Sequence, residues 1–217
     1  MSALRIRIQP PQSPPPQPAI IPLGSSRRWI SPHEGDEDPV TALSIFLTQS
    51  AYSRAVIHAA SEPEYEVGGV LLGKWCQDVE NGRQFVVAET ALPARFTRQG
   101  SVYLTFTQKS LLDIHAKIDR DFPGKDIVGW YHTHPRIGIF LSHYDTWLHD
   151  HFFPEPWQIA LVIEPHAATG GFFIREPDGT LDPSRYCGFY ELDGSIGHSV
   201  VHWRNLRHLE EAGQEGE

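Results

Sequence analysis

The residues with the clearest chemical potential are two histidines, His132 and His134, in the segment that reads WYHTHP from position 130. On a β-strand, residues two positions apart project from the same face, so both imidazoles can approach one ion. Pro135 lacks the amide hydrogen that a central strand needs, which predicts that the strand ends beside the metal. A His-x-His pair alone is usually just two polar strand residues, so further ligands are needed to indicate a metal site.

A third metal ligand and an oxyanion donor are available shortly after this strand. Asp145 is the natural third ligand, because a catalytic zinc takes three protein ligands and keeps one position open. We expect Asp145 in the first turn of a helix, with Ser142 near the N-cap. The Ser142 hydroxyl would then lie close to the metal and donate a hydrogen bond to a developing oxyanion. The same two residues also fit a capping box, and the two roles are compatible.

A hydrolytic zinc site also needs a general base. The best candidate is Glu66, at the mouth of an apolar, glycine-containing segment that begins at position 67. At this place burial and a nearby cation would compete to set the pKa of the carboxyl group. Glu62 and Glu64 remain rivals, because their spacing in the sequence does not separate them from Glu66.

The remaining histidines and the two cysteines carry weaker signals. His149 and His151 could form a second metal pair, but side chains two positions apart on a helix point to different faces. His143 would hydrogen-bond to substrate or face water. Cys76 and Cys187 are expected to be small buried hydrophobic residues. Two cysteines are no disulfide framework, so a reducing cytoplasm is the expected compartment, although a bridge between them stays open.

The elements that must position these residues follow from hydrophobic periodicity. The pattern predicts an α/β fold with a central, mostly antiparallel sheet flanked by helices. Asn81-Gly82 indicates a hairpin turn. Helices are expected after a cap at Thr48 or Ser50, over 111–122, where the apolar residues form one stripe, and over 142–153. The expected strands are 43–47, 67–75, 84–90, 102–106, 127–132, 157–163, 172–175 and 186–191, with a further strand considered at 199–203.

The chain divides into a folded domain at 39–194 and two flanking segments. Residues 1–38 are expected to be a proline-rich disordered tail, because the prolines between 10 and 18 cannot join a helix or a central strand. The tail is then a solvated linker or, alternatively, a docking peptide for a partner, with Arg5–Ile8 adding to a sheet edge. Residues 195–217 are expected to be a C-terminal extension that is partly disordered.

Charge and hydropathy exclude two classes of protein. The net charge is −9, and the first 33 residues hold four arginines and no acidic residue, which leaves 14 Lys and Arg against 27 Asp and Glu in the remainder. An acidic body argues against nucleic-acid binding, which needs clustered basic residues. No apolar run is long enough to span a membrane. We therefore expect neither a nucleic-acid partner nor a membrane.

Taken together, the motifs resemble the signature of the JAMM (MPN-plus, JAB) zinc metallopeptidases. That signature is a Glu, then at a distance His-Ser/Thr-His-Pro, and then Ser-x-x-Asp with the serine eight positions after the second histidine. This chain is similar in its flanking segments too, at 66–73, 128–131, 159–165 and 171–173, so the resemblance covers roughly 41–192. The matching residues are Glu66, His132, Thr133, His134, Pro135, Ser142 and Asp145.

The resemblance implies an MPN fold and a mechanism. His132, His134 and Asp145 would hold one zinc ion with water as the fourth ligand, and Glu66 would take the proton of that water and pass it to the leaving amine. Ser142 would stabilise the oxyanion. The implied activity is cleavage of a peptide or isopeptide bond at the C-terminus of a ubiquitin-like protein, by deconjugation or precursor processing. Such a tail would lie extended along an edge strand, with small residues passing the zinc.

The resemblance also has limits. Some relatives carry a second, structural zinc site after the third ligand, but here only His166 and Cys187 are available in that region, too few for a closed site. The compact form resembles prokaryotic members, some of which accompany conjugation systems, so pathway proteins are expected partners of the N-terminal tail. Two alternatives stay open: a peptidase that trims a sulfur-carrier or other peptide tail, and a non-catalytic MPN scaffold. A zinc deaminase would need a Cys-x-x-Cys pair, which is absent.

Overall fold

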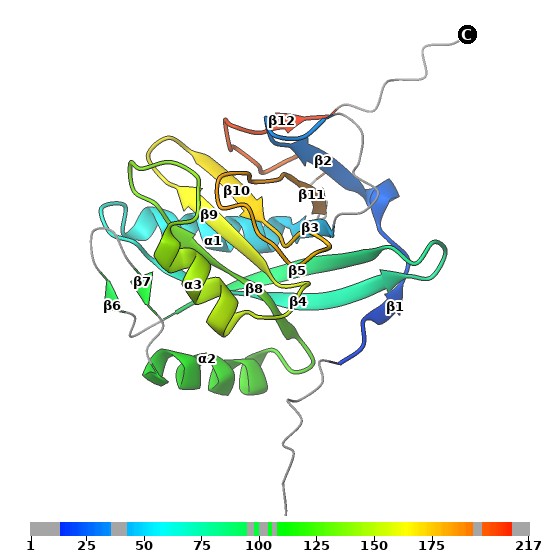
Figure 1. The fold of residues 1–217 in the computed structure, drawn as a ribbon, viewed down its shortest axis with the longest axis horizontal. Coiled ribbons are helices and arrows are strands. Elements are labelled where there is room, and N and C mark those ends of the chain that lie inside the picture. Colours follow the sequence, from blue (N-terminus) through cyan, green and yellow to red (C-terminus); the bar gives the residue numbers. More distant parts are fainter. Residues whose placement is uncertain are drawn as a thin grey trace, which may run out of the picture.

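The computed structural model describes residues 14–35, 43–94, 98–99, 104–105, 108–192 and 197–209. Most strands of these ranges join one curled sheet with the order β10-β9-β8-β4-β5-β3-β11-β2-β12 (Figure 1). The helices are α1 (Gln49–Ser61), α2 (Gln108–Asp121) and α3 (His143–Phe152), with a 3-10 turn, η1, at Leu23–Ser25. The strands are β1 (Gln17–Ala19), β2 (Ser26–Ile30), β3 (Ser44–Thr48), β4 (Gly68–Asp78), β5 (Gln84–Pro93), β6 (Arg98–Gln99), β7 (Leu104–Thr105), β8 (Asp126–Thr133), β9 (Ile159–Glu164), β10 (Thr169–Phe173), β11 (Phe189–Leu192) and β12 (Arg207–His208).

The sheet is mixed and curls back on itself. Antiparallel pairings outnumber parallel ones by five to four, which agrees with the predicted α/β fold and its mostly antiparallel sheet. A bridge between Phe172 of β10 and Cys187, just before β11, links two strands that stand far apart in the strand order. The sheet therefore wraps around a core instead of lying open.

The two faces of the sheet bury different sets of side chains, because successive residues of a strand point to opposite sides. Leu71, Tyr131 and Leu161 belong to the core that α1 covers. Trp130 and Val162 point the other way, into the core that α2 and α3 cover. Figure 1 shows α1 behind the strands and α3 in front of them. The residue two positions after Trp130, His132, therefore projects toward the side of α3.

Most predicted elements are found close to their expected positions. Thr48 caps α1, its side chain accepting the amide hydrogen of Ala51 at 3.1 Å. Gly82 has a φ of 75° in the turn between β4 and β5, which confirms the hairpin predicted at Asn81-Gly82. The strand expected at 102–106 falls largely on residues outside the described ranges.

Two segments differ from the predictions. Residues 17–19 and 26–30, assigned to a disordered tail, form β1 and β2 and pair with β4 and β11. β1 contains Pro18, which has no amide hydrogen to donate, and it pairs with a single neighbouring strand, β4, as an edge strand with a proline can. The segment 199–203 is not a strand; its residues Val201 and Trp203 are buried against the core, and β12 follows at 207–208.

Among the helices of the described residues, none is both long and apolar enough to cross a lipid bilayer.

Candidate metal centre

Strand β8 delivers the two histidines to one place. His132 lies near its end, and the amide of His134 donates to the carbonyl of Ile163 at 2.9 Å, so the extended backbone continues past the last strand residue. Both side chains project from the same face. They are almost completely buried, with 0% and 1% of their surface exposed.

Three potential ligand atoms converge at this face. The Nε2 atoms of His132 and His134 lie 2.9 Å apart, and the Asp145 carboxylate oxygens lie 3.3 Å from the first and 3.4 Å from the second. His132, His134 and Asp145 are the one group of three or more such residues, within the described ranges, whose ligand atoms all approach within 4.8 Å. Two imidazole nitrogens and one carboxylate oxygen match the ligand set of a catalytic zinc site.

Hydrogen bonds and burial set the protonation states of these three side chains. The Nδ1 atom of His134 contacts the carbonyl of Gly138 at 3.2 Å, which fixes the proton on Nδ1 and leaves Nε2 as the lone-pair nitrogen. Burial opposes ionisation of Asp145, but His132, His134 and Ser142 outweigh it and lower the pKa of its carboxyl group. Burial also lowers the pKa of His132. The cluster therefore holds a carboxylate beside a histidine that favours the neutral form.

The N-terminus of α3 brings Asp145 to the histidines. The Ser142 side chain accepts the amide hydrogen of Asp145 at 3.2 Å, and the Asp145 carboxylate accepts the amide hydrogen of Ser142 at 2.7 Å. These two bonds confirm the predicted capping box. Because the hydroxyl oxygen of Ser142 acts as acceptor here, its hydrogen remains available to donate. Ser142 is half-buried, so a ligand at the cluster can reach it.

Glu66 reaches the same face from the segment just before β4. Gly68 pairs with His132, so continuing this antiparallel register places Glu66 opposite His134. Burial raises the pKa of the Glu66 carboxyl to about 7, with His134 lowering it and Asp145 raising it further. Gly69 leaves no room for a side chain, since an added Cβ would lie 2.2 Å from the carbonyl oxygen of Leu92.

Thr133, between the two histidines, fixes Glu66 in this position. Its amide donates to the carbonyl of Val67, and its hydroxyl accepts the amide hydrogen of Val67, both at 2.9 Å. The hydroxyl also donates to the carbonyl of Tyr65 at 3.3 Å. Thr133 alternates with the two histidines and so lies on the opposite face of β8, but its contacts with the segment before β4 are not predicted by its position in the sequence.

The rivals of Glu66 lie elsewhere. Glu62 follows the end of α1 and is exposed. Glu64 is exposed too, and its carboxylate pairs with Arg136 at 3.1 Å. Of the three candidates, the structure brings Glu66 alone to the buried face of the cluster.

The other histidines on α3 do not join the cluster. His143 is exposed, and His151 contacts the carbonyl of Trp147 at 2.7 Å. His149 is buried, with its Nδ1 accepting the indole hydrogen of Trp130 at 3.0 Å. Burial first, and then the Arg175 guanidinium, lowers the pKa of His149 to about 3. His149 is therefore a neutral residue of the helix–sheet interface.

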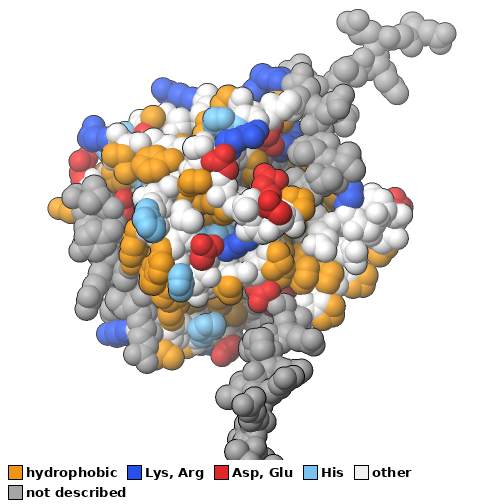
Figure 2. All heavy atoms as spheres, viewed as in Figure 1, with side chains coloured by type: hydrophobic (Ala, Val, Ile, Leu, Met, Phe, Trp, Pro, Cys, Tyr) orange, Lys and Arg blue, Asp and Glu red, His pale blue; other side chains and the backbone are white. Residues whose placement is uncertain are grey.

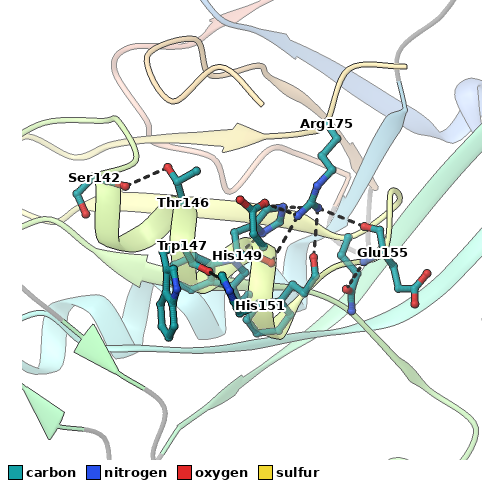
Figure 3. A network of polar contacts seen from close by, with 11 residues as sticks. Ser142, Thr146, Trp147, His149, His151, Glu155 and Arg175 are labelled. Carbon is teal, nitrogen blue, oxygen red and sulfur yellow. Dashed lines mark hydrogen bonds and ion pairs between the residues drawn. The ribbon is translucent and has the colours of Figure 1, made fainter. Parts of the chain in front are cut away.

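The hydrogen bond between Trp130 and His149 links β8 to α3 next to the cluster. Trp130 stacks on the ring of His132, with centroids 4.5 Å apart and planes within 8°. Arg175 holds the end of α3, where its guanidinium donates to the carbonyls of Phe153 and Glu155 at 3.2 and 3.3 Å (Figure 3). The helix that carries Asp145 is thus fixed at both ends and tied to the strand that carries His132.

The outward face of α3 carries aromatic side chains. Tyr144, Trp147 and Phe152 are each more than one-third exposed. Trp147 stacks against Tyr144 and His151, with centroids 5.7 and 4.6 Å away. In Figure 2, hydrophobic atoms and histidines gather on the part of the surface that α3 occupies in Figure 1.

Comparisons with known proteins agree with this fold. Residues 41–153 match the family model described as JAB1/Mov34/MPN/PAD-1 ubiquitin protease. COP9 signalosome complex subunit 5 of Drosophila melanogaster is 30% identical over 178 residues, which cover 76% of this chain and 51% of that protein. The same subunit of Dictyostelium discoideum is 29% identical over 166 residues, covering 73% and 48%.

One further relative and one solved structure also match part of the chain. The NAD(+) hydrolase TcpA of a Theionarchaea archaeon is 30% identical over 131 residues, which cover 60% of this chain and 36% of that protein. A solution structure of a Desulfitobacterium hafniense protein aligns with a TM-score of 0.49 at 20% identity, covering 65% of this chain and 91% of that one.

The curled α/β sheet with a buried His-His-Asp cluster at the end of β8 defines a protein of the MPN class. Because the family model matches more than half of its residues, the chain belongs to the JAB1/Mov34/MPN/PAD-1 family. It spans about half the length of the signalosome subunits that it matches.

Proposed function

We propose that this protein is a zinc-dependent peptidase or isopeptidase that cleaves at the C-terminus of a ubiquitin-like protein. The convergence of His132, His134 and Asp145 within 4.8 Å, beside a buried glutamate, is the observation that carries the proposal. Family membership supports the substrate class, because the family model is described as that of a ubiquitin protease.

The donor set fits zinc, and this chain's own residues account for the remaining chemistry. When bound by His132, His134 and Asp145, zinc supplies a Lewis acid and a water molecule of lowered pKa. Glu66 acts as the general base, because a carboxyl group with a pKa of about 7 accepts and returns a proton near neutral pH. It takes the proton of the attacking water on a carboxylate oxygen and passes it to the leaving amine.

Ser142 stabilises the charge that develops on the scissile carbonyl. Its oxygen accepts the amide hydrogen of Asp145, which positions the hydroxyl and leaves its hydrogen to donate to a ligand. A donor fixed before the reaction stabilises an oxyanion without reorganising during it. The capping box therefore serves both the helix and the proposed chemistry.

The test combines zinc content with cleavage of a ubiquitin-like protein fused through its C-terminus to a reporter. Wild-type protein should bind about one zinc per chain and release the reporter. His132→Ala combined with His134→Ala should lose the zinc, and Glu66→Ala should keep the zinc and lose cleavage. Protein that binds no zinc after metal-replete purification would overturn the proposal and leave a non-catalytic scaffold as the better description.

A further inference from the structure

The face that carries the metal cluster continues outward to one exposed ion pair. Gly68 pairs with His132 at the end of the β4–β8 ladder; beyond it, Glu64 precedes Glu66 by two positions and Arg136 follows His134 by two, each in a turn. The Arg136 guanidinium does contact the Glu64 carboxylate, at 3.1 Å. Its side chain is 63% exposed and that of Glu64 is 62% exposed. The pair therefore stands at the mouth of the site, one step beyond Glu66 and His134.

Arg136 has a backbone conformation that arginine rarely adopts. Its φ is 65°, in the left-handed region where a Cβ atom is unfavourable and glycine is the usual residue. The amide of Arg136 donates to the buried Glu164 carboxylate at 3.0 Å, and the same carboxylate accepts the amide hydrogens of His166 and Ala167 at 2.9 and 2.5 Å. Glu164 thus holds the loop in place whichever residue stands at position 136.

Folding does not explain an arginine at this position. The contact with Glu64 is an exposed ion pair, and such pairs contribute little to stability. A glycine would adopt the same φ without strain and would keep the amide hydrogen bond to Glu164. Strain that the fold does not require, two residues from a candidate metal ligand, points to a role in function.

We propose that Arg136 determines substrate specificity by binding a carboxylate close to the scissile bond. The inference rests on the proposed function and adds the chemical class of the substrate, a peptide with an Asp or Glu side chain or a free C-terminal carboxylate near the cleaved bond. A guanidinium binds a carboxylate through two parallel hydrogen bonds, and the substrate takes the place of Glu64.

The charges around the mouth favour this assignment. The carboxyl groups of Glu64 and Glu164, which are not among the proposed zinc ligands, would by themselves repel an acidic peptide. Arg136 supplies a positive charge beside them, in reach of solvent. Glu64 holds the guanidinium in place until a substrate carboxylate arrives, and the exposure of the pair makes that exchange easy.

Binding of matched peptides tests the proposal without requiring cleavage. The full-length, zinc-loaded protein carries Glu66→Ala, so that no peptide is cut, and is applied to an array of ten-residue peptides. Each peptide is present with Asp or Glu and with the matching Asn or Gln, and with a free or an amidated C-terminus. We expect peptides with the carboxylate to bind at least about fivefold more tightly than the matching peptides with the amide. The Asp/Glu against Asn/Gln comparison tests a side-chain carboxylate, and the free against amidated C-terminus comparison tests a terminal one.

Variants at position 136 then identify the arginine as the cause. Arg136→Gly should abolish the preference and melt at the same temperature as the parent or higher, which excludes unfolding as the reason. Arg136→Lys should keep part of the preference, and Arg136→Glu should shift it toward basic peptides. Arg120→Ala removes an exposed, ion-paired arginine from α2 and should change nothing.

Two results would overturn the assignment. One is a preference for acidic peptides that stays at its full size in the Arg136→Gly variant, and the other is the absence of any such preference in the parent protein. Zinc content and cleavage by the protein with Glu66 intact are measured separately. A protein that selects acidic peptides through Arg136 and cuts none of them would refute the proposed function and leave the binding role of Arg136 standing.

Discussion

At the scale of single residues, the proposed chemistry depends on Glu66 remaining a titratable group in a buried place. Glu66→Gln keeps the shape and removes the base, so cleavage of the reporter fusion should fall by about 10²–10⁴-fold. Zinc content should stay at the wild-type value, because Glu66 is not among the three converging ligands. Glu62→Gln is the matched control, since it changes an exposed carboxyl group four positions earlier that has no part in the proposed site. A Glu66→Gln protein with near-normal rates would assign the base to another residue.

Ser142 combines two roles that a pair of variants can separate. Ser142→Ala removes the helix cap and the proposed oxyanion donor, so it should lower the free energy of unfolding by about 1 kcal/mol and the rate by about 10²–10³-fold. Thr48→Ala removes the equivalent cap of α1, where the side chain accepts the amide hydrogen of Ala51. It should cost similar stability and leave the rate unchanged. Equal rate losses in both variants, measured at a temperature where both are folded, would reduce Ser142 to a structural cap.

At the scale of elements, α3 must keep its position against β8 so that Asp145 reaches His132 and His134. Arg175→Ala removes the donor to the carbonyls of Phe153, at the C-cap of α3, and of Glu155 just beyond it, and should destabilise the protein by about 1–3 kcal/mol. Because Asp145 lies on this helix, zinc affinity should fall by about tenfold or more, as measured by chelator competition.

Asp150→Asn serves as the control for the Arg175 variant. It removes an exposed partner of Arg175 and leaves the contacts with the carbonyls intact, so stability and zinc affinity should change little. Unchanged zinc affinity in the Arg175→Ala protein would show that the end of α3 is not coupled to the ligand at its start.

The sequence predicted the elements that local patterns encode and the residues that form the cluster. The alternation of His132 and His134, the cap at Ser142 and the hairpin at Asn81-Gly82 depend only on near neighbours. The choice among Glu62, Glu64 and Glu66 depends on the register between β4 and β8, which spacing along the chain does not contain. The role of β2 was missed for the same reason, because its partners β11 and β12 lie more than 150 positions away. Arg136 gave no signal, since a positive φ shows only in the folded chain.

At the scale of the whole molecule, a buried carboxylate joins three distant segments. Glu191 on β11 is fully buried and accepts hydrogen bonds from Trp29 of β2 at 3.0 Å and Gln49 of α1 at 2.9 Å. It also accepts from the hydroxyl of Ser199 at 2.7 Å and the amide of Val200 at 2.9 Å. The segments that precede and follow the predicted domain of residues 39–194 thereby share one buried hydrogen-bond acceptor, in addition to the pairing of β2 with β11 and the packing of Val201 and Trp203.

This attachment makes stability depend on pH in a defined direction. Burial opposes ionisation of Glu191, but hydrogen bonds, the largest from Ser199, outweigh it and lower the pKa of the carboxyl group from its ordinary value of 4.5. A group with a lowered folded-state pKa contributes stability above its unfolded pKa, and that contribution is lost as the pH falls through the folded value. The link between the flanking segments and the core should therefore weaken in acid.

Glu191→Gln tests the size and the direction of this effect. The amide cannot accept all four hydrogen bonds, so at pH 7 the free energy of unfolding in urea should fall by about 2–4 kcal/mol. As the pH falls below about 4.5 and then through the lower folded-state pKa, the difference from wild type should shrink, because Glu191 becomes protonated first in the unfolded and then in the folded wild-type protein. Asp119→Asn, at an exposed position of α2, should follow the wild-type profile at every pH. A difference that stays constant or grows in acid would mean that the ionised form of Glu191 is not what holds the segments together.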